Sequence, residues 1–203
     1  MMSLVPTALD RLFSDSRMFD SRRAWRRAGF EVFDPAKETE VMVAAHPSAP
    51  GCLFKKYGPD VSSKEQRENY DRRTAGAAEV ARFIADQRLT YVVVPRKRVH
   101  DLSGDESILV VERMDIIGKG ASAQSFRSIP EPVLREMLRV MVRYRGLDSN
   151  SKNVQLTRDG KIAFIDLEHW DRTDRDRVRL KSIREYLSKD GRKIAKRILA
   201  ELE

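Results

Sequence analysis

Three oxygen-bearing side chains, Asp148, Asn153 and Asp166, flank a short predicted hairpin. Residues 154–156 and 161–165 have the composition of two strands joined by a tight turn. Such a hairpin brings Asn153, which opens the first strand, close to Asp166, which ends the second. Carboxylate and amide oxygens suit magnesium, which usually keeps water and substrate phosphates among its ligands. Asp148, on the loop leading in, is placed to accept a hydroxyl proton while a metal neutralises phosphate charge. The pattern predicts a metal–phosphate site.

A purely structural role for these side chains is the alternative. Aspartate and asparagine favour turns and caps, so Asp148 and Asn153 taken alone also fit ordinary turn positions. Asp166 is harder to explain in that way, because it ends an apolar strand, where a carboxylate must be paired, solvated or bound to a metal. The three residues together therefore favour a functional site.

Each of two charged residues next to the hairpin has two possible roles. Lys152 either steadies a transferring phosphate or is a solvated loop lysine. Glu168 either adds a metal ligand or binds Arg172. The three histidines are scattered, with no cysteine or second histidine at zinc spacing, so a zinc site is not expected.

Apolar spacing predicts the elements that must position these residues. Strand-like runs dominate residues 30–115, with one long helix over about 63–88 between them. Helical spacing dominates residues 129–203, where the last helical region begins near Arg177 and breaks near Gly191. The chain is therefore expected to be α+β.

The segment 116–128 is rich in Gly, Ser and Ala, and we expect it to be a linker between two lobes. Residues 1–115 are predicted to form an N-terminal extension and a lobe built on an antiparallel sheet with one main helix. Residues 116–203 are predicted to form a small, mostly helical lobe that carries the catalytic hairpin.

Composition is that of a soluble globular protein. The 203 residues are 41% hydrophobic and 34% charged, and no apolar run approaches the about 18 residues of a membrane helix. The N-terminus lacks a basic start followed by an apolar stretch, and the single cysteine, Cys52, allows no internal disulfide. We expect a cytoplasmic monomer without a membrane span. Delivery to a host cell by a route that needs no signal peptide stays open.

The formal net charge of +8 suits phosphate-bearing partners such as nucleic acids and nucleotides. The Arg-rich segments near both ends also have amphipathic helical spacing, with Trp25 as the aromatic residue among the first group of arginines. Solvated helix faces are the reading we favour, so nucleic-acid binding is not expected.

The order Asp148, four residues, Asn153, hairpin, Asp166-Leu167-Glu168 resembles the catalytic core of the protein-kinase-like superfamily. In that family the first Asp serves the acceptor hydroxyl, and the Asn and second Asp bind magnesium. The resemblance implies a two-lobed kinase-like fold with ATP and Mg²⁺ as cofactors.

Upstream residues extend the resemblance. The run Leu53–Tyr57 resembles the strand whose lysine holds the α- and β-phosphates; Lys55 is our candidate, and Lys56 is the alternative because a strand alternates sides. Glu79 resembles the helix glutamate that pairs with this lysine, and Glu65 and Glu68 are weaker candidates.

The run 109–115 resembles the hinge that presents backbone groups to adenine, here the Glu112 carbonyl and the Met114 N–H. The resemblance covers about residues 50–170.

The chain also departs from the family pattern. No Gly-rich loop stands before the phosphate lysine, and Gly146-Leu147 replaces the His-Arg pair before the catalytic Asp. Gln155 occupies a position where an apolar residue often supports adenine, and little chain follows Asp166. These features resemble minimal kinases: lipopolysaccharide-core and RIO kinases, aminoglycoside-type phosphotransferases and small kinase effectors of bacterial pathogens.

The resemblance implies transfer of phosphate from ATP to an alcohol group, with a protein Ser/Thr hydroxyl favoured over a small molecule or a lipid-linked sugar. A pseudokinase binding module and transfer of AMP on the same fold are the alternatives. For a kinase, the resemblance implies that Lys55, Glu79 and Lys152 act on the phosphates and that Asp148 acts on the acceptor hydroxyl.

Overall fold

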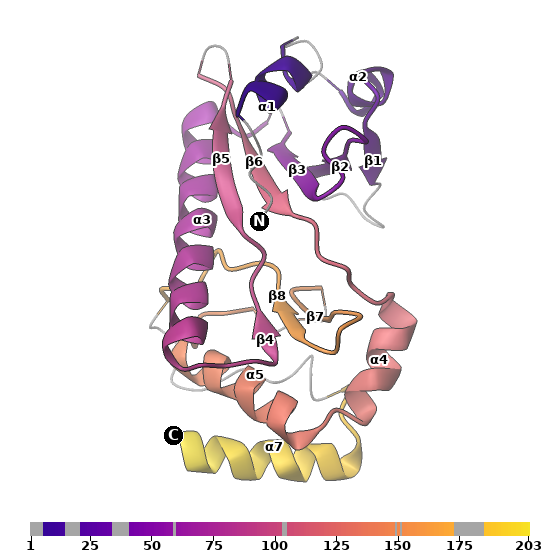
Figure 1. Ribbon diagram of the computed structural model, residues 1–203. Coiled ribbons are helices and arrows are strands. Elements are labelled where there is room, and N and C mark those ends of the chain that lie inside the picture. The colour runs from indigo at the N-terminus through magenta and orange to yellow at the C-terminus, as the bar shows by residue number, and fades with distance from the viewer. Residues whose placement is uncertain are drawn as a thin grey trace. The chain divides into compact units, whose positions relative to one another are not determined.

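The computed structural model describes residues 6–14, 21–33, 41–58, 60–102, 105–148, 150, 152–172 and 185–203. The chain is a mixed α+β protein with an antiparallel sheet and several helices (Figure 1). It divides into two compact units, neither of which is continuous in sequence. The first contains Met1–Thr74 and Arg96–Arg113, and the second contains Ala75–Pro95 and Met114–Glu203.

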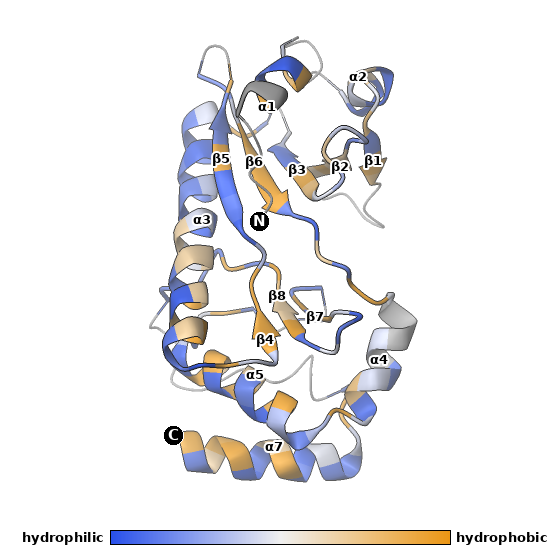
Figure 2. Cartoon of the chain, in the orientation of Figure 1, coloured by the Kyte–Doolittle hydropathy of each residue, from blue (hydrophilic) through white to orange (hydrophobic). Residues whose placement is uncertain are grey.

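The first unit is built on a five-stranded antiparallel sheet with the strand order β1-β2-β3-β6-β5. Its strands are β1 (Glu31–Phe33), β2 (Val41–Ala45), β3 (Cys52–Tyr57), β5 (Lys97–Asp101) and β6 (Ser107–Glu112). The apolar run of β6 is buried over nearly its whole length, as the sequence predicts, and it is mostly orange in Figure 2.

Each face of this sheet has its own core, because successive side chains of a strand point to opposite sides. One core joins Phe54 and Val110 of the sheet to Leu9 and Trp25, from the short helices α1 (Pro6–Leu12) and α2 (Arg22–Arg27). Ser21 is extended, with φ −164° and ψ 158°, and its side chain caps α2, so α1 and α2 are separate helices. Cys52 is buried in this core, and burial raises the pKa of its thiol.

The other face packs against the long helix α3 (Ser63–Asp86), whose position confirms the predicted helix over 63–88. Tyr57 and Leu109 of the sheet contact Tyr70 of α3 in this second core. Ser62 caps α3, since its Oγ accepts a hydrogen bond from the Glu65 N–H at 3.3 Å.

A buried lysine completes the packing of this unit. Lys56 is only 4% exposed, and its Nζ donates to Gln66 Oε1 at 2.7 Å and pairs with the Glu106 carboxylate. Glu106 is 39% exposed, so water solvates the acid much better than the base.

This asymmetry gives a stability prediction. Glu106→Gln is expected to lower the free energy of unfolding by about 3 kcal/mol, because the buried Lys56 ammonium loses the negative charge of Glu106. Lys56→Met is expected to cost only about 1 kcal/mol, because water can solvate the carboxylate that remains. Urea unfolding of both variants measures the difference, and equal losses would contradict it.

The second unit holds the later helices and a three-stranded sheet with the order β4-β8-β7. Its elements are β4 (Val92–Val93), α4 (Lys119–Arg127), α5 (Glu131–Arg143), β7 (Val154–Leu156), β8 (Ile162–Phe164) and α7 (Lys189–Leu202). β7 and β8 form the predicted antiparallel hairpin, and β4 pairs with β8 in parallel. The core includes Val80 from the second half of α3, Leu138 from α5 and Ile198 from α7.

One sequence prediction for this unit is wrong. The expected linker 116–128 contains helix α4, which Phe126 anchors because its ring is buried in the core. The helix break expected near Gly191 falls next to a non-helical stretch, residues 185–188, after which α7 begins. Gly191 lies in the first turn of α7 and donates its N–H to the capping Ser188 Oγ at 3.0 Å. The start of the tail helix near Arg177 lies outside the described residues.

Among the described residues, no helix is both long and apolar enough to cross a membrane.

Candidate functional site

The hairpin places Asn153 and Asp166 at its open end. Val154 pairs with Phe164 in register, and the Ile165 N–H donates to the Asn153 carbonyl at 2.7 Å. Asp166 therefore follows directly after the last paired residue of the second strand. At the closed end Gly160 has φ +82°, a left-handed conformation that glycine adopts easily.

The loop before the hairpin brings Asp148 into contact with Asn153. Asp148 Oδ2 accepts hydrogen bonds from Asn153 Nδ2 at 3.2 Å and from Asn150 Nδ2 at 2.6 Å. Asp148 Oδ1 accepts from the Asn150 N–H at 3.2 Å. Two of the three predicted residues are thus joined directly.

Sequence reasoning missed Asn150, which organises this loop. Its Oδ1 accepts from the Lys152 N–H at 2.8 Å and from the Asn153 N–H at 3.1 Å, while its own amide binds Asp148. The signal was present in the run Asp-Ser-Asn, since Asp and Asn side chains often bond backbone groups two residues on.

Asp166 is half-buried, and its Oδ1 accepts from the Glu168 N–H at 3.2 Å. Leu167 is fully buried between the two acids and fixes the backbone there. Trp170 packs against Gly76 of α3, where an added Cβ would lie 2.5 Å from the indole and 2.6 Å from the Leu167 carbonyl. The segment that carries Asp166 is thereby anchored on the second half of α3.

The donors present fit a magnesium ion with few protein ligands. Asn153 uses Nδ2 to bind Asp148, and its Oδ1 receives no hydrogen bond within the described part of the chain. This oxygen and the Asp166 carboxylate are hard ligands of the kind magnesium takes alongside water and phosphate. No group of three or more His, Cys, Asp or Glu residues at metal-binding distance occurs among the described residues. The donor chemistry thus suits an ion held largely by substrate.

Lys152 and Glu168, the charged neighbours of the hairpin, each keep the two possible roles described above. Lys152 is exposed, and its carbonyl accepts from Gln155 Nε2 at 2.6 Å. Glu168 is half-buried. Metal ligation by Glu168 and phosphate contact by Lys152 stay predictions.

Gly146 explains one departure from the kinase pattern. A Cβ at this position would lie 2.0 Å from the His169 carbonyl oxygen and 2.8 Å from the Arg172 Cβ. The loop that carries Asp148 therefore packs so closely against residues 169–172 that only glycine fits. A histidine here would have no room.

Glu79 lies on the second half of α3, where its Oε1 accepts from the Tyr144 hydroxyl at 3.2 Å and its other oxygen pairs with Arg82. Burial and the nearby Glu79 carboxylate raise the pKa of Tyr144. Lys55 belongs to the first unit and Glu79 to the second, so their predicted pairing stays a prediction. Glu65 and Glu68 are exposed on α3.

The two lysines of β3 lie on opposite faces of the sheet. Lys55 pairs in register with Leu109, which belongs to the core on the α3 side, and it is half-buried. Lys56 pairs with Met42, which belongs to the opposite core, and its ammonium already binds Gln66 and Glu106.

The predicted hinge follows β6. The Glu112 N–H donates to the Arg96 carbonyl at 2.8 Å, and the Glu112 carboxylate is bound by the Arg96 guanidinium. Burial opposes ionisation of Glu112, but the hydrogen bonds from Arg96 outweigh it and lower the pKa of this carboxyl. The Met114 carbonyl accepts from the Ile116 N–H at 3.1 Å, whereas the Met114 N–H has no acceptor among the described residues.

No protein-family description and no curated protein matches this sequence. Solved structures that match this chain include the kinase domain of Mycobacterium tuberculosis PknI, with 19% identity over 70% of this chain and a TM-score of 0.36. The apo form of PpkA-294 is similar with 14% identity over 82% of this chain and a TM-score of 0.36. The chain spans 60% and 64% of these two structures. Likeness at this level adds no weight beyond the chain's own geometry.

Proposed function

We propose that this protein is an ATP- and magnesium-dependent phosphotransferase with a minimal kinase-like fold. The observation that carries the proposal is the meeting of Asp148 and Asn153 at 3.2 Å beside the end of the strand that presents Asp166. A base for the acceptor hydroxyl and two magnesium ligands then lie at one end of one hairpin. Phosphate transfer needs little more from a protein than positioning and charge stabilisation.

Each residue has a separate task. Asp148 orients the acceptor hydroxyl and takes its proton as the oxygen attacks the γ-phosphorus; the bond from that phosphorus to the bridging oxygen breaks, and ADP leaves. Asn153 and Asp166 hold magnesium, which neutralises charge on the phosphates when bound. The hydrogen bonds from Asn150 and Asn153 hold the Asp148 carboxylate in one orientation.

The nucleotide contacts come from upstream. Lys55 binds the α- and β-phosphates, and Glu79 orients it. The position of Lys55 on the α3 side of the sheet, with Lys56 already neutralised by Glu106, supports this choice between the two lysines. The Glu112 carbonyl and the Met114 N–H bind adenine, and Lys152 steadies the transferring phosphate.

The acceptor we favour is a Ser or Thr hydroxyl of a protein, and a small molecule or a lipid-linked sugar is the alternative. A pseudokinase that binds ATP without transfer is the competing function. Gln155 favours it, because this polar residue occupies a place where adenine usually meets an apolar side chain.

Incubation with γ-³²P-ATP and magnesium, alone and with a cell lysate, tests the proposal. Magnesium-dependent label on a protein band would support a protein kinase, and label on a small product would support the alternative acceptor. If ATP raises the melting temperature of the protein but no phosphate is transferred from ATP, the protein is a pseudokinase and not an enzyme. An AMP transferase would show label only from α-³²P-ATP.

The choice of lysine has its own test. Lys55→Met is expected to raise the KM for ATP about 10- to 100-fold, because the phosphates lose a charge-assisted hydrogen bond. Lys56→Met is expected to leave this KM within a factor of about three. Steady-state kinetics on both purified variants measure the contrast, and the opposite order would assign the role to Lys56.

A further inference from the structure

Tyr144 stands where helix α5 ends and the loop to Asp148 begins. It is the C-cap residue of α5, and its carbonyl accepts a hydrogen bond from the Leu147 N–H at 3.0 Å. Leu147 is buried and directly precedes Asp148. The backbone turn that leads to the proposed base therefore starts at Tyr144.

The side chain of Tyr144 binds the second half of α3, which lies beside this end of α5 (Figure 1). Its hydroxyl donates to Glu79 Oε1 at 3.2 Å and also lies 3.3 Å from the Glu79 carbonyl oxygen. Burial, and after it the Glu79 carboxylate, raises the pKa of Tyr144, so the hydroxyl stays a donor at neutral pH. A carboxylate offers about four acceptor sites, so Glu79 can bind Tyr144 and Arg82 and still accept from a lysine.

The ring of Tyr144 also contacts the segment that follows Asp166. It packs edge-on against Trp170, with the ring centroids 6.4 Å apart, and edge-on against Phe83 of α3 at 5.6 Å. Trp170 in turn lies on Gly76 of α3. All of these residues belong to the second unit. One side chain thus joins α3 to both segments that carry proposed functional acids.

The hydroxyl does something that the ring does not. Apolar contact between rings tolerates small sliding movements, whereas a hydrogen bond weakens steeply when its geometry is lost. The bond from Tyr144 to Glu79 therefore fixes where the end of α5 stands along α3. The loop that starts at this end is fixed with it.

We propose that Tyr144 is a positioning residue of the active site, whose hydroxyl, bound to Glu79, holds the loop that carries Asp148 in place against α3. This role depends on the proposed function, in which Asp148 serves the acceptor hydroxyl. Misplacement of a reacting group by about 1 Å can slow a reaction about 100-fold, so a small shift of this loop is enough to matter. Glu79 keeps its pair with Arg82 when the hydroxyl is lost, so ATP binding is not expected to suffer.

Tyr144→Phe tests the proposal, because it removes the hydroxyl and keeps the ring. This variant is expected to lower kcat about 5- to 20-fold, while the dissociation constant for ATP, measured by calorimetry, stays within about twofold. Tyr91→Phe removes the hydroxyl of a tyrosine that is 42% exposed in the same unit, and this matched control should keep the wild-type kcat. An unchanged kcat in Tyr144→Phe, or a loss confined to ATP affinity, would overturn the proposal.

Backbone hydrogen exchange tests the link to the loop without any need for phosphate transfer. The N–H groups of Leu147 and Asn153 are hydrogen-bonded within this part of the chain, so their exchange reports local opening. Tyr144→Phe should speed exchange of the peptide that contains both residues at least about threefold, and Tyr91→Phe should not.

Glu79→Ala shows whether the hydroxyl acts through Glu79. It should speed exchange of the same peptide, and adding Tyr144→Phe to it should have little further effect, because the hydroxyl no longer has a carboxylate to bind. Additive effects, or wild-type exchange in Tyr144→Phe, would overturn the inference. A wild-type protein that transfers no phosphate would overturn the proposed function instead, and exchange would still decide whether Tyr144 holds the loop.

Discussion

Replacing Asp166 with asparagine is expected to lower phosphate transfer about a thousandfold. The carboxylate would supply one of only two protein ligands to magnesium, and a bound metal contributes several kcal/mol of charge stabilisation to such a transition state. Each 1.36 kcal/mol of lost transition-state stabilisation lowers the rate tenfold, so the loss of several kcal/mol lowers it about a thousandfold. The rate of label transfer at saturating ATP and fixed magnesium measures it.

Matched variants separate this effect from general damage. Asp171→Asn removes an exposed acid five residues further on and should transfer phosphate at the wild-type rate. Asp148→Asn should lower kcat by about 10²- to 10⁴-fold while ATP binding persists, because it removes a base and not a metal ligand. An Asp166→Asn variant that is folded and fully active would exclude the proposed metal site.

Gly146→Ala is expected to lower the free energy of unfolding by about 2–3 kcal/mol. The new methyl group would lie 2.0 Å from a backbone oxygen, that of His169, so neither partner can move aside by a simple side-chain rotation. Overpacking of this kind costs about 1–3 kcal/mol. Thermal unfolding should show a fall of roughly 5–10 °C for a chain of this size. Phosphate transfer should fall as well, since Asp148 lies two residues further along the same loop.

Gly118→Ala is the control for this prediction. A Cβ at Gly118 meets nothing within 4 Å, and its φ of −58° suits any residue. The melting temperature of this variant should lie within about 3 °C of the wild type, given the modest cost of alanine at a helix cap. If both glycine variants melt alike, close packing at Gly146 is not the reason for the glycine.

The sequence alone predicted the parts that depend on short-range pattern. The hairpin, the long helix α3 and the buried strand β6 have strong periodicity, and all three are confirmed. Asp148 and Asn153 were predicted as neighbours of one site, and their contact follows from a loop of a few residues.

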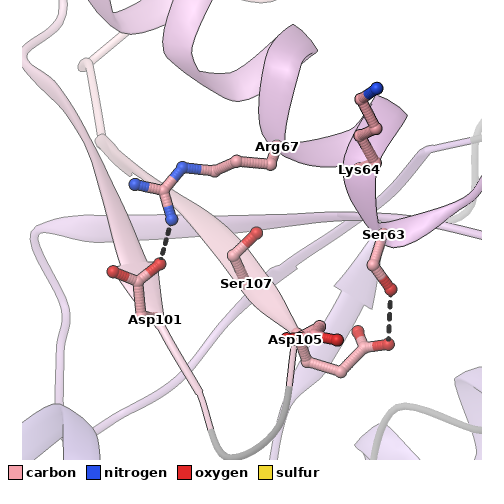
Figure 3. A pocket seen from close by; sticks show the side chains of 7 residues that line it. Ser63, Lys64, Arg67, Asp101, Asp105 and Ser107 are labelled. Atoms are coloured by element: carbon pink, nitrogen blue, oxygen red, sulfur yellow. Dashed lines mark hydrogen bonds and ion pairs between the residues drawn. The ribbon is translucent and has the colours of Figure 1, made fainter.

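The missed features depend on partners far away in sequence. The segment that forms α4 was predicted to be a linker because it is rich in Gly, Ser and Ala. The helix is anchored because Phe126 is buried in a core that other elements build. The need for glycine at position 146 comes from the carbonyl of His169, which no local pattern reveals. The contact between the start of α3 and the next hairpin, where the Ser63 hydroxyl donates to Glu106 of the β5–β6 turn region at 3.3 Å (Figure 3), likewise joins segments that are separated in the chain.

The parallel pairing of β4 with β8 has a consequence for how the chain assembles during synthesis. Val92 leaves the ribosome long before Ile162, its partner in the ladder. Until that later segment emerges, β4 has no strand to pair with, and the second unit cannot close. A fragment cut at residue 115 would separate these two strands permanently. We therefore expect the carboxyl-terminal half to fold only when residues 75–95 are supplied, so the two halves of this gene are not exchangeable modules.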